Sequence, residues 1–218
     1  MFVGHYGVSF AAKRVVPAVS LATLFIAVQL LDVGWSVFVL LGIEKVRIVP
    51  GITATNPLDL YYMPYTHSLV AALAWSALAF IAYKLLGSGA TGRSALVVAV
   101  AVFSHWVLDF LVHRPDLPLF DDGVKVGLGL WNYPAMAFGV EIAFLFGGLW
   151  LYFSSGVRRR GAMIVFGLVM LGLQAYIFFG PPPASDRAAA LTALAAYLLF
   201  AAVIRVLERR TLGAAGTA

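Results

Sequence analysis

The sequence contains no cysteine and few charged residues. Without cysteine, disulfides and thiolate metal ligands are excluded. Charged residues make up 11% of the 218 positions, whereas soluble globular proteins carry about 25%. A chain with so few charges cannot cover a surface that faces only water, so its solvent must be partly lipid. A very apolar subunit hidden in a soluble assembly is the alternative, but the long unbroken apolar runs argue against it.

Six apolar runs are long enough to cross a bilayer, which takes about 20 helical residues. They lie at Val15–Leu41, Ser68–Leu86, Ser94–Val112, Ala135–Phe153, Ala162–Phe179 and Ala188–Val206. Proline and glycine clusters separate them, and backbone in lipid must be helical to satisfy its own hydrogen bonds. The sequence therefore predicts an all-α polytopic membrane protein of about six transmembrane helices.

The predicted helices differ in polarity along the chain. The last two carry almost no polar side chains beyond Gln174 and Thr192. We therefore expect one transmembrane domain over residues 1–218, in which residues 1–153 carry the site and residues 154–218 support it.

The basic residues predict the orientation of the chain. Six spans place both termini on one side, and the loops of that side hold ten of the fifteen basic residues and a single acid, Glu208. These ten are Lys13, Arg14, Lys84, Arg93, Arg158, Arg159, Arg160, Arg205, Arg209 and Arg210. Basic loops favour the cytoplasm, so both termini are predicted to be cytoplasmic. The net charge of +5 is thus an orientation feature, and no nucleic-acid surface is expected.

Ionisable residues inside the predicted spans cost about 2.5 kcal/mol or more each and are functional candidates for that reason. Six polar groups lie within or at the ends of the first four spans: Asp32, His67, His105, Asp109, His113 and Glu141. Counting along each span places all six towards the extracytoplasmic side. We expect them to meet there.

The third span presents a ligand pattern. His105, Asp109 and His113 are spaced i, i+4, i+8 and project from one face of a helix. Imidazole and carboxylate groups bind Zn²⁺ and similar metals, and Asp32 and His67 would add ligands from facing helices. Simpler roles stay open, because His67 could cap its helix and Asp32 could bond a neighbouring helix.

Three motifs resemble a known family. Gly4-His5-Tyr6-Gly7, Tyr65-Thr66-His67-Ser68 and the segment Ser104–Asp109 are similar to motifs of the LexA-regulated, predicted metal-dependent hydrolases of the bacterial inner membrane. The resemblance covers roughly residues 4 to 115. It implies a multi-pass protein of the bacterial inner (cytoplasmic) membrane with hydrolase activity. The implied metal ligands are His5, Asp32, His67, His105 and Asp109.

The chain departs from that family at two places. The usual Pro-Asp-x-Asp is Leu31-Asp32-Val33-Gly34 here, and a His-Arg pair before Thr-His-Ser is replaced by Tyr62-Met63. Fewer ligands favour one metal over two, or a degenerate site with no catalysis. His5 also precedes the cytoplasmic Lys13, so it reaches the site only if residues 1–12 re-enter the bilayer as a half-helix.

The residues themselves predict a buried polar, metal-binding centre, and the resemblance implies that the chain is a membrane-embedded metal-dependent hydrolase. A divalent metal, expected to be zinc, would activate water against a lipid or other phosphoester that enters from the extracytoplasmic face. Glu141 or Asp116 would be the general base, and His113 would hold or protonate the leaving group. Arg114 and Lys125, in the loop above, would meet an anionic headgroup.

Two other classes stay open. One is an ion- or proton-handling transporter, and the other is a non-catalytic subunit of a membrane complex. A transporter needs polar groups towards both faces, whereas the cytoplasmic halves of the predicted helices are almost wholly apolar. Membrane lipids are the expected partners in every case.

Overall fold

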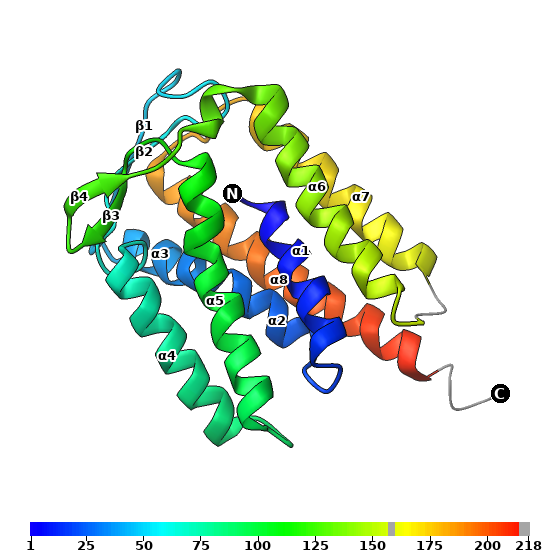
Figure 1. The fold of residues 1–218 in the computed structure, drawn as a ribbon. Helices are drawn as coiled ribbons and strands as arrows, with labels where there is room; N and C mark the ends of the chain where they lie inside the picture. The colour runs from blue at the N-terminus through cyan, green and yellow to red at the C-terminus, as the bar shows by residue number, and fades with distance from the viewer. Residues whose placement is uncertain (157–159, 214–218) are drawn as a thin grey trace.

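The computed structural model describes residues 1–156 and 160–213, and within them helices predominate (Figure 1). The helices are α1 (Val3–Val15), α2 (Leu21–Val28), α3 (Leu30–Leu40), α4 (Leu69–Leu86), α5 (Gly92–Val112), α6 (Pro134–Phe153), α7 (Arg160–Phe179) and α8 (Asp186–Gly213), with a short 3₁₀ helix, η1 (Leu130–Asn132). Two residues of the charge pattern, Arg158 and Arg159, lie outside the described residues, as does the side chain of Arg210.

The prediction of an all-α polytopic membrane protein is confirmed. Helices α4, α5, α6, α7 and α8 are each long and apolar enough to cross a membrane, and α2 with α3 forms a sixth, broken span. Only 11% of the apolar window of α4 is buried inside the protein. Its outward leucines, such as Leu78 and Leu85, therefore face the lipid that the composition requires.

The first predicted span, Val15–Leu41, is not one helix. Helix α1 ends at Val15, two residues before Pro17, and the hydroxyl of Ser20 caps α2 by accepting from the amide of Thr23 at 3.0 Å. The chain then bends by 56° between α2 and α3, at Gln29. Such a break is tolerated in a membrane only where other groups satisfy the freed backbone.

Helix α1 corresponds to the expected N-terminal half-helix. It lies inside the bundle, with Lys13 and Arg14 in its last turn and Met1 at its other end, next to Asp109 of α5. In Figure 1 the N-terminus accordingly lies between α5 and α6, whereas the end of α8 lies at the opposite end of the molecule.

Helices α1 and α6 touch backbone to backbone. A Cβ added at Gly7 would overlap the carbonyl of Phe144, and one added at Gly148 would overlap the backbone of Gly7. Small residues at a helix interface permit this close approach, which is how membrane helices associate. The contact fixes the position of α1 along α6 and the angle between the two helices.

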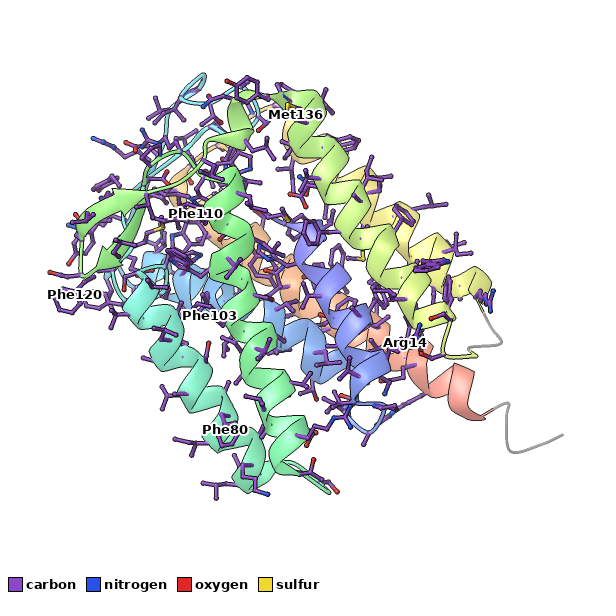
Figure 2. The ribbon with its side chains drawn as sticks, in the orientation of Figure 1. Arg14, Phe80, Phe103, Phe110, Phe120 and Met136 are labelled. Atoms are coloured by element: carbon purple, nitrogen blue, oxygen red, sulfur yellow. The ribbon has the colours of Figure 1, made fainter. Side chains whose placement is uncertain are left out.

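The bundle has two different ends. Around Lys13 and Arg14 the interior is filled by packed aromatic rings: Phe10 meets Phe25 edge to face, and Phe25 stacks on Phe166. At the other end lie η1 and two short hairpins, β1 (Lys45–Ile48) with β2 (Leu58–Tyr62) and β3 (Leu117–Phe120) with β4 (Gly123–Val126), which the sequence did not predict. Figure 2 shows Met136 at this second end and Arg14 towards the first.

We expect Gly148→Ala to destabilise the protein by about 1–3 kcal/mol, because the new methyl group forces α1 away from α6. The matched control is Gly147→Ala on the same helix, where a Cβ would meet nothing within 4 Å. Denaturant unfolding in detergent micelles measures both. Equal stability of the two variants would show that the close contact does not hold α1.

Candidate metal centre

Imidazole and carboxylate groups from separate segments meet inside the bundle. We call them the His/Asp cluster: His5 of α1, Asp32 of α3, His67 before α4, and His105, Asp109 and His113 of α5 and its end. All six are buried except Asp32, whose side chain is 16% exposed. The convergence expected from the sequence is therefore present, and it includes His5.

Four members of the cluster form a ring of alternating nitrogen and oxygen atoms. His67 Nε2 lies 3.3 Å from Asp32 Oδ1 and 3.7 Å from Asp109 Oδ2, and His105 Nε2 lies 3.6 Å and 3.0 Å from the same two oxygens. Ligand atoms placed tetrahedrally at zinc bond lengths of about 2.0–2.1 Å are about 3.3–3.4 Å apart. The ring has the size of a single four-coordinate site.

The break after α2 orients His105. Its Nδ1 lies 2.7 Å from the carbonyl oxygen of Val28, which can only accept a hydrogen bond. Nδ1 therefore carries the hydrogen, and Nε2 presents its lone pair to the ring. The Val28 carbonyl is available because α2 ends there, so the 56° bend supplies the group that fixes this imidazole.

A hydroxyl and a carboxylate orient His67. Thr66 Oγ1 lies 2.7 Å from His67 Nδ1 and donates to Glu44 Oε2 at 2.7 Å, so its oxygen accepts from Nδ1–H. Glu44 also accepts from the amides of Tyr65 and Thr66. Burial raises the pKa of the Glu44 carboxyl, against the opposing effect of these hydrogen bonds. The role of Glu44 was missed in the sequence, because it lies in a loop 23 residues away from His67.

His113 is held in the same way, by Asp116. Its Nδ1 lies 2.9 Å from Asp116 Oδ1, and its Nε2 lies 3.6 Å from Asp109 Oδ2. The second oxygen of Asp116 accepts from Arg114 Nε at 3.2 Å. Both oxygens of Asp116 are thus engaged away from the ring. Asp116 is placed to position His113 and not, as the sequence suggested, to act as the general base.

These hydrogen bonds leave three imidazole lone pairs directed at carboxylate oxygens. A lone pair and a carboxylate oxygen at 3.0–3.7 Å repel each other unless a cation or a proton lies between them. His105 Nε2 is buried and, among the residues that the structure describes, has no hydrogen-bond partner. The donor atoms are of the kinds that could hold a divalent metal ion, and their imidazoles have partners of the kind that orient metal-bound histidines.

His5 contacts the other side of Asp109. Its Nε2 lies 3.2 Å from Asp109 Oδ1, and its ring stacks on that of His105 with centroids 4.0 Å apart. The ligand atoms of His5, His105 and Asp109 lie within 4.8 Å of one another, as do those of Asp32, His67 and His105. His5 is therefore both a candidate ligand and a hydrogen-bond partner of a ligand.

Glu141 anchors the helix that carries His5. Its two oxygens accept from the backbone amides of Phe2 at 2.9 Å and Gly4 at 2.6 Å, at the N-terminus of α1. A carboxylate at this position satisfies unpaired amides and interacts favourably with the helix dipole. Both oxygens are thus occupied, so Glu141 holds α1 in place. The structure does not leave it free for the general-base role suggested by the sequence.

Helix α8 also contributes to the cluster. The hydroxyl of Tyr197 donates to Asp32 Oδ2 at 2.7 Å. A tyrosine in an otherwise apolar helix gave no indication of this in the sequence. The last two helices are therefore not only supporting elements.

A cavity of about 740 Å³ adjoins the cluster. The residues of the cluster that line it are Asp32, His67, Asp109 and His113, together with Glu141.

The two cations expected to meet a headgroup have other partners. Arg114 bonds Asp59 and Asp116, and Lys125 bonds Asp122 and the carbonyl of Tyr61.

No protein-family model, curated protein or solved structure matches the chain. The resemblance to the LexA-regulated hydrolases therefore stays a prediction from the motifs around His5, His67 and His105. The interpretation of the cluster depends on its own geometry.

We expect Thr66→Val to lower the affinity for zinc by about 10–100-fold, because His67 loses the acceptor that fixes its Nδ1–H. The control is Thr91→Val, which removes a hydroxyl that caps α5 at the opposite end of the bundle. Competition with a zinc chelator measures both affinities. Equal affinity in the two variants would contradict the orienting role of Thr66.

Proposed function

We propose that the chain is a membrane-embedded, metal-dependent hydrolase and that Asp32, His67, His105 and Asp109 hold a divalent cation, expected to be zinc. The observation that carries the proposal is the fixed direction of the imidazoles. Each Nδ1–H of His67, His105 and His113 is bonded outwards. The Nε2 atoms of His67 and His105 therefore face both Asp32 and Asp109, and that of His113 faces Asp109. A divalent cation would compensate the two carboxylates, and the α-amino group of Met1 pairs with the other oxygen of Asp109, Oδ1; both lower the cost of burying the carboxylates.

A bound cation of this kind supplies Lewis-acid activation and lowers the pKa of a bound water towards 7. The cavity brings a substrate against Asp32 and Asp109, on the side of the cluster where Asp32 is partly exposed. We infer a phosphoester substrate, in line with the resemblance to predicted hydrolases.

His113 is the residue best placed to move protons. It lines the cavity, and Asp116 is placed to stabilise its protonated ring through Nδ1. In the proposed reaction the oxygen of water bonds to phosphorus and the ester P–O bond breaks. His113 Nε2 takes a proton from the water and returns one to the leaving alcohol, so the products are an alcohol and a phosphate with one ester fewer.

No specific observation favours the alternative of an ion or proton transporter. Between the cluster and the end that carries Lys13, the interior is filled by Phe10, Phe25, Phe166 and their neighbours. The cavity opens on the opposite side, through the loop that contains Pro50 and Ala54. Access from one side suits an enzyme better than a transporter.

The proposed location is the bacterial inner membrane, with the cluster towards the extracytoplasmic side. Lys13, Arg14 and Lys84 lie at the end of the bundle away from the cluster, and basic residues favour the cytoplasmic side.

We expect the protein, purified in detergent without chelators, to contain about one zinc ion per chain. Asp109→Asn and His105→Ala should lose this metal, because the first removes the charge of one ligand and the second removes a ligand altogether. Asp59→Asn is the control, since this buried acid pairs with Arg47 and Arg114 and not with the cluster. Elemental analysis gives the result, and wild-type protein without metal would overturn the proposed centre.

We expect the zinc-loaded protein to hydrolyse bis(4-nitrophenyl) phosphate, and His113→Gln to lower kcat by about 10²–10⁴-fold with its metal retained. Release of nitrophenolate measures the rate. A variant that keeps both its metal and its kcat would remove His113 from the reaction. No turnover by metal-loaded wild-type protein with this ester or with lipid phosphoesters would refute the hydrolase.

A further inference from the structure

The cavity beside the cluster lies between two spanning helices. Helix α7 packs mainly on α6, whereas α8 packs on α2 and α3. Residues of α7, such as Leu173 and Ile177, and small residues of α8, such as Ala189 and Ala193, line the cavity from its two sides. Helices α7 and α8 therefore form the two walls of a cleft beside the cluster.

The cavity reaches two kinds of surface. Its lining includes Pro50 and Ala54, which are exposed in the loop between β1 and β2. It also includes Tyr176 and Ile177, which are 60% and 44% exposed on α7, a helix long and apolar enough to span the membrane. The second surface faces lipid, so the cavity is open sideways to the bilayer as well as to the loops.

Polar groups in the cavity wall lack partners. Gln174 is 1% exposed, and within residues 1–156 and 160–213 its Oε1 has no hydrogen-bond partner. The indole Nε1 of Trp35, one turn from Asp32 on α3, is buried and unpartnered in the same part of the chain. Such groups are costly inside a membrane protein unless a ligand bonds them. Both residues line the cavity.

We propose that the substrate is a bilayer phospholipid that enters sideways between α7 and α8. Its acyl chain lies in the cleft against Leu173, Ile177 and Ala193, and its phosphoester lies beside Trp35 and Gln174, next to the cluster. Trp35 Nε1–H donates to a phosphate oxygen, and Gln174 Oε1 accepts from a hydroxyl or ammonium group of the headgroup. The inference rests on the proposed hydrolase for the reaction, but the lipid site can be tested without it.

The shape and chemistry of the cavity favour a lipid over a water-soluble ester. Its volume of about 740 Å³ lies in the range of pockets that enclose a drug-sized organic ligand. Arg114 and Lys125, which would attract a soluble anion, are engaged with acidic partners and do not line it. An apolar chain already dissolved in the bilayer meets the cleft at the depth of the cluster.

The test uses the full-length protein in vesicles of phosphatidylethanolamine and phosphatidylglycerol with a trace of phosphatidylglycerol that carries a diazirine in its acyl chain. We expect light to cross-link the acyl chain to residues that line the cavity, such as Leu173, Ile177, Ala189 and Ala193. Ala193→Trp, which fills the cleft, should lower this labelling at least fivefold. Ala195→Trp is the matched control, because Ala195 is exposed on the same helix and does not line the cavity.

A second variant shows whether weaker labelling of Ala193→Trp could come from misfolding. Gln174→Leu keeps the size of the side chain and removes its polar group, so we expect an unchanged melting temperature and at least threefold weaker labelling. Labelling that is equal in wild type, Ala193→Trp and Gln174→Leu would overturn the lipid site. Labels confined to outward residues such as Leu198 and Leu199 would do so too.

Hydrolysis then separates the two proposals. We expect Ala193→Trp to lower turnover of a long-chain phosphatidylglycerol at least tenfold more than turnover of bis(4-nitrophenyl) phosphate. Equal losses on both esters would overturn the sideways entry of lipid and leave the hydrolase. Specific labelling without any hydrolysis would support the lipid site and overturn the hydrolase.

Discussion

The carboxylates of Asp32 and Asp109 lie inside a bundle of apolar helices, and the surrounding structure follows from the need to compensate their charge. A buried carboxylate is tolerated only when other groups bond it or neutralise it. Here the compensation comes from imidazoles, from the α-amino group of Met1 beside Asp109, and from the hydroxyl of Tyr197 beside Asp32. Asp32 also lies in the first turn of α3, where the helix dipole favours an anion. A divalent cation bound between the two carboxylates would complete the compensation of their charge.

Irregular backbone near the cluster is used to build it. The break between α2 and α3 frees the carbonyl of Val28 for His105, and the N-terminus of α1 offers its amides to Glu141. Each break would be unfavourable in lipid, but each is buried in protein where a polar side chain satisfies it. The same two contacts direct His105 and His5 at Asp109. The departures from straight spanning helices are thus the positioning elements of the centre.

The sequence predicts the spans and the meeting of ligands better than it predicts how the ligands are held. Length and hydropathy locate helices α4 to α8, and the i, i+4 spacing places His105 and Asp109 on one face of α5. The break at Gln29 was hidden because the apolar run continues on both sides of it, from α2 into α3. Glu44 and Tyr197 were missed because their partners are distant in sequence. Only the structure shows that the oxygens of Glu141 bond the amides of α1 and that those of Asp116 bond His113 and Arg114.

The two openings of the cavity match the two products of a lipid phosphoesterase. Hydrolysis separates an apolar chain, which belongs in the bilayer, from a polar headgroup, which belongs in water. The side between α7 and α8 leads to lipid, and the loop around Pro50 leads to the extracytoplasmic solvent in the proposed orientation. Each product can therefore leave into its own solvent without crossing the aromatic packing around Phe10 and Phe25. A site with these two exits at one end needs no alternating access, which agrees with the aromatic packing that fills the bundle at the end that carries Lys13.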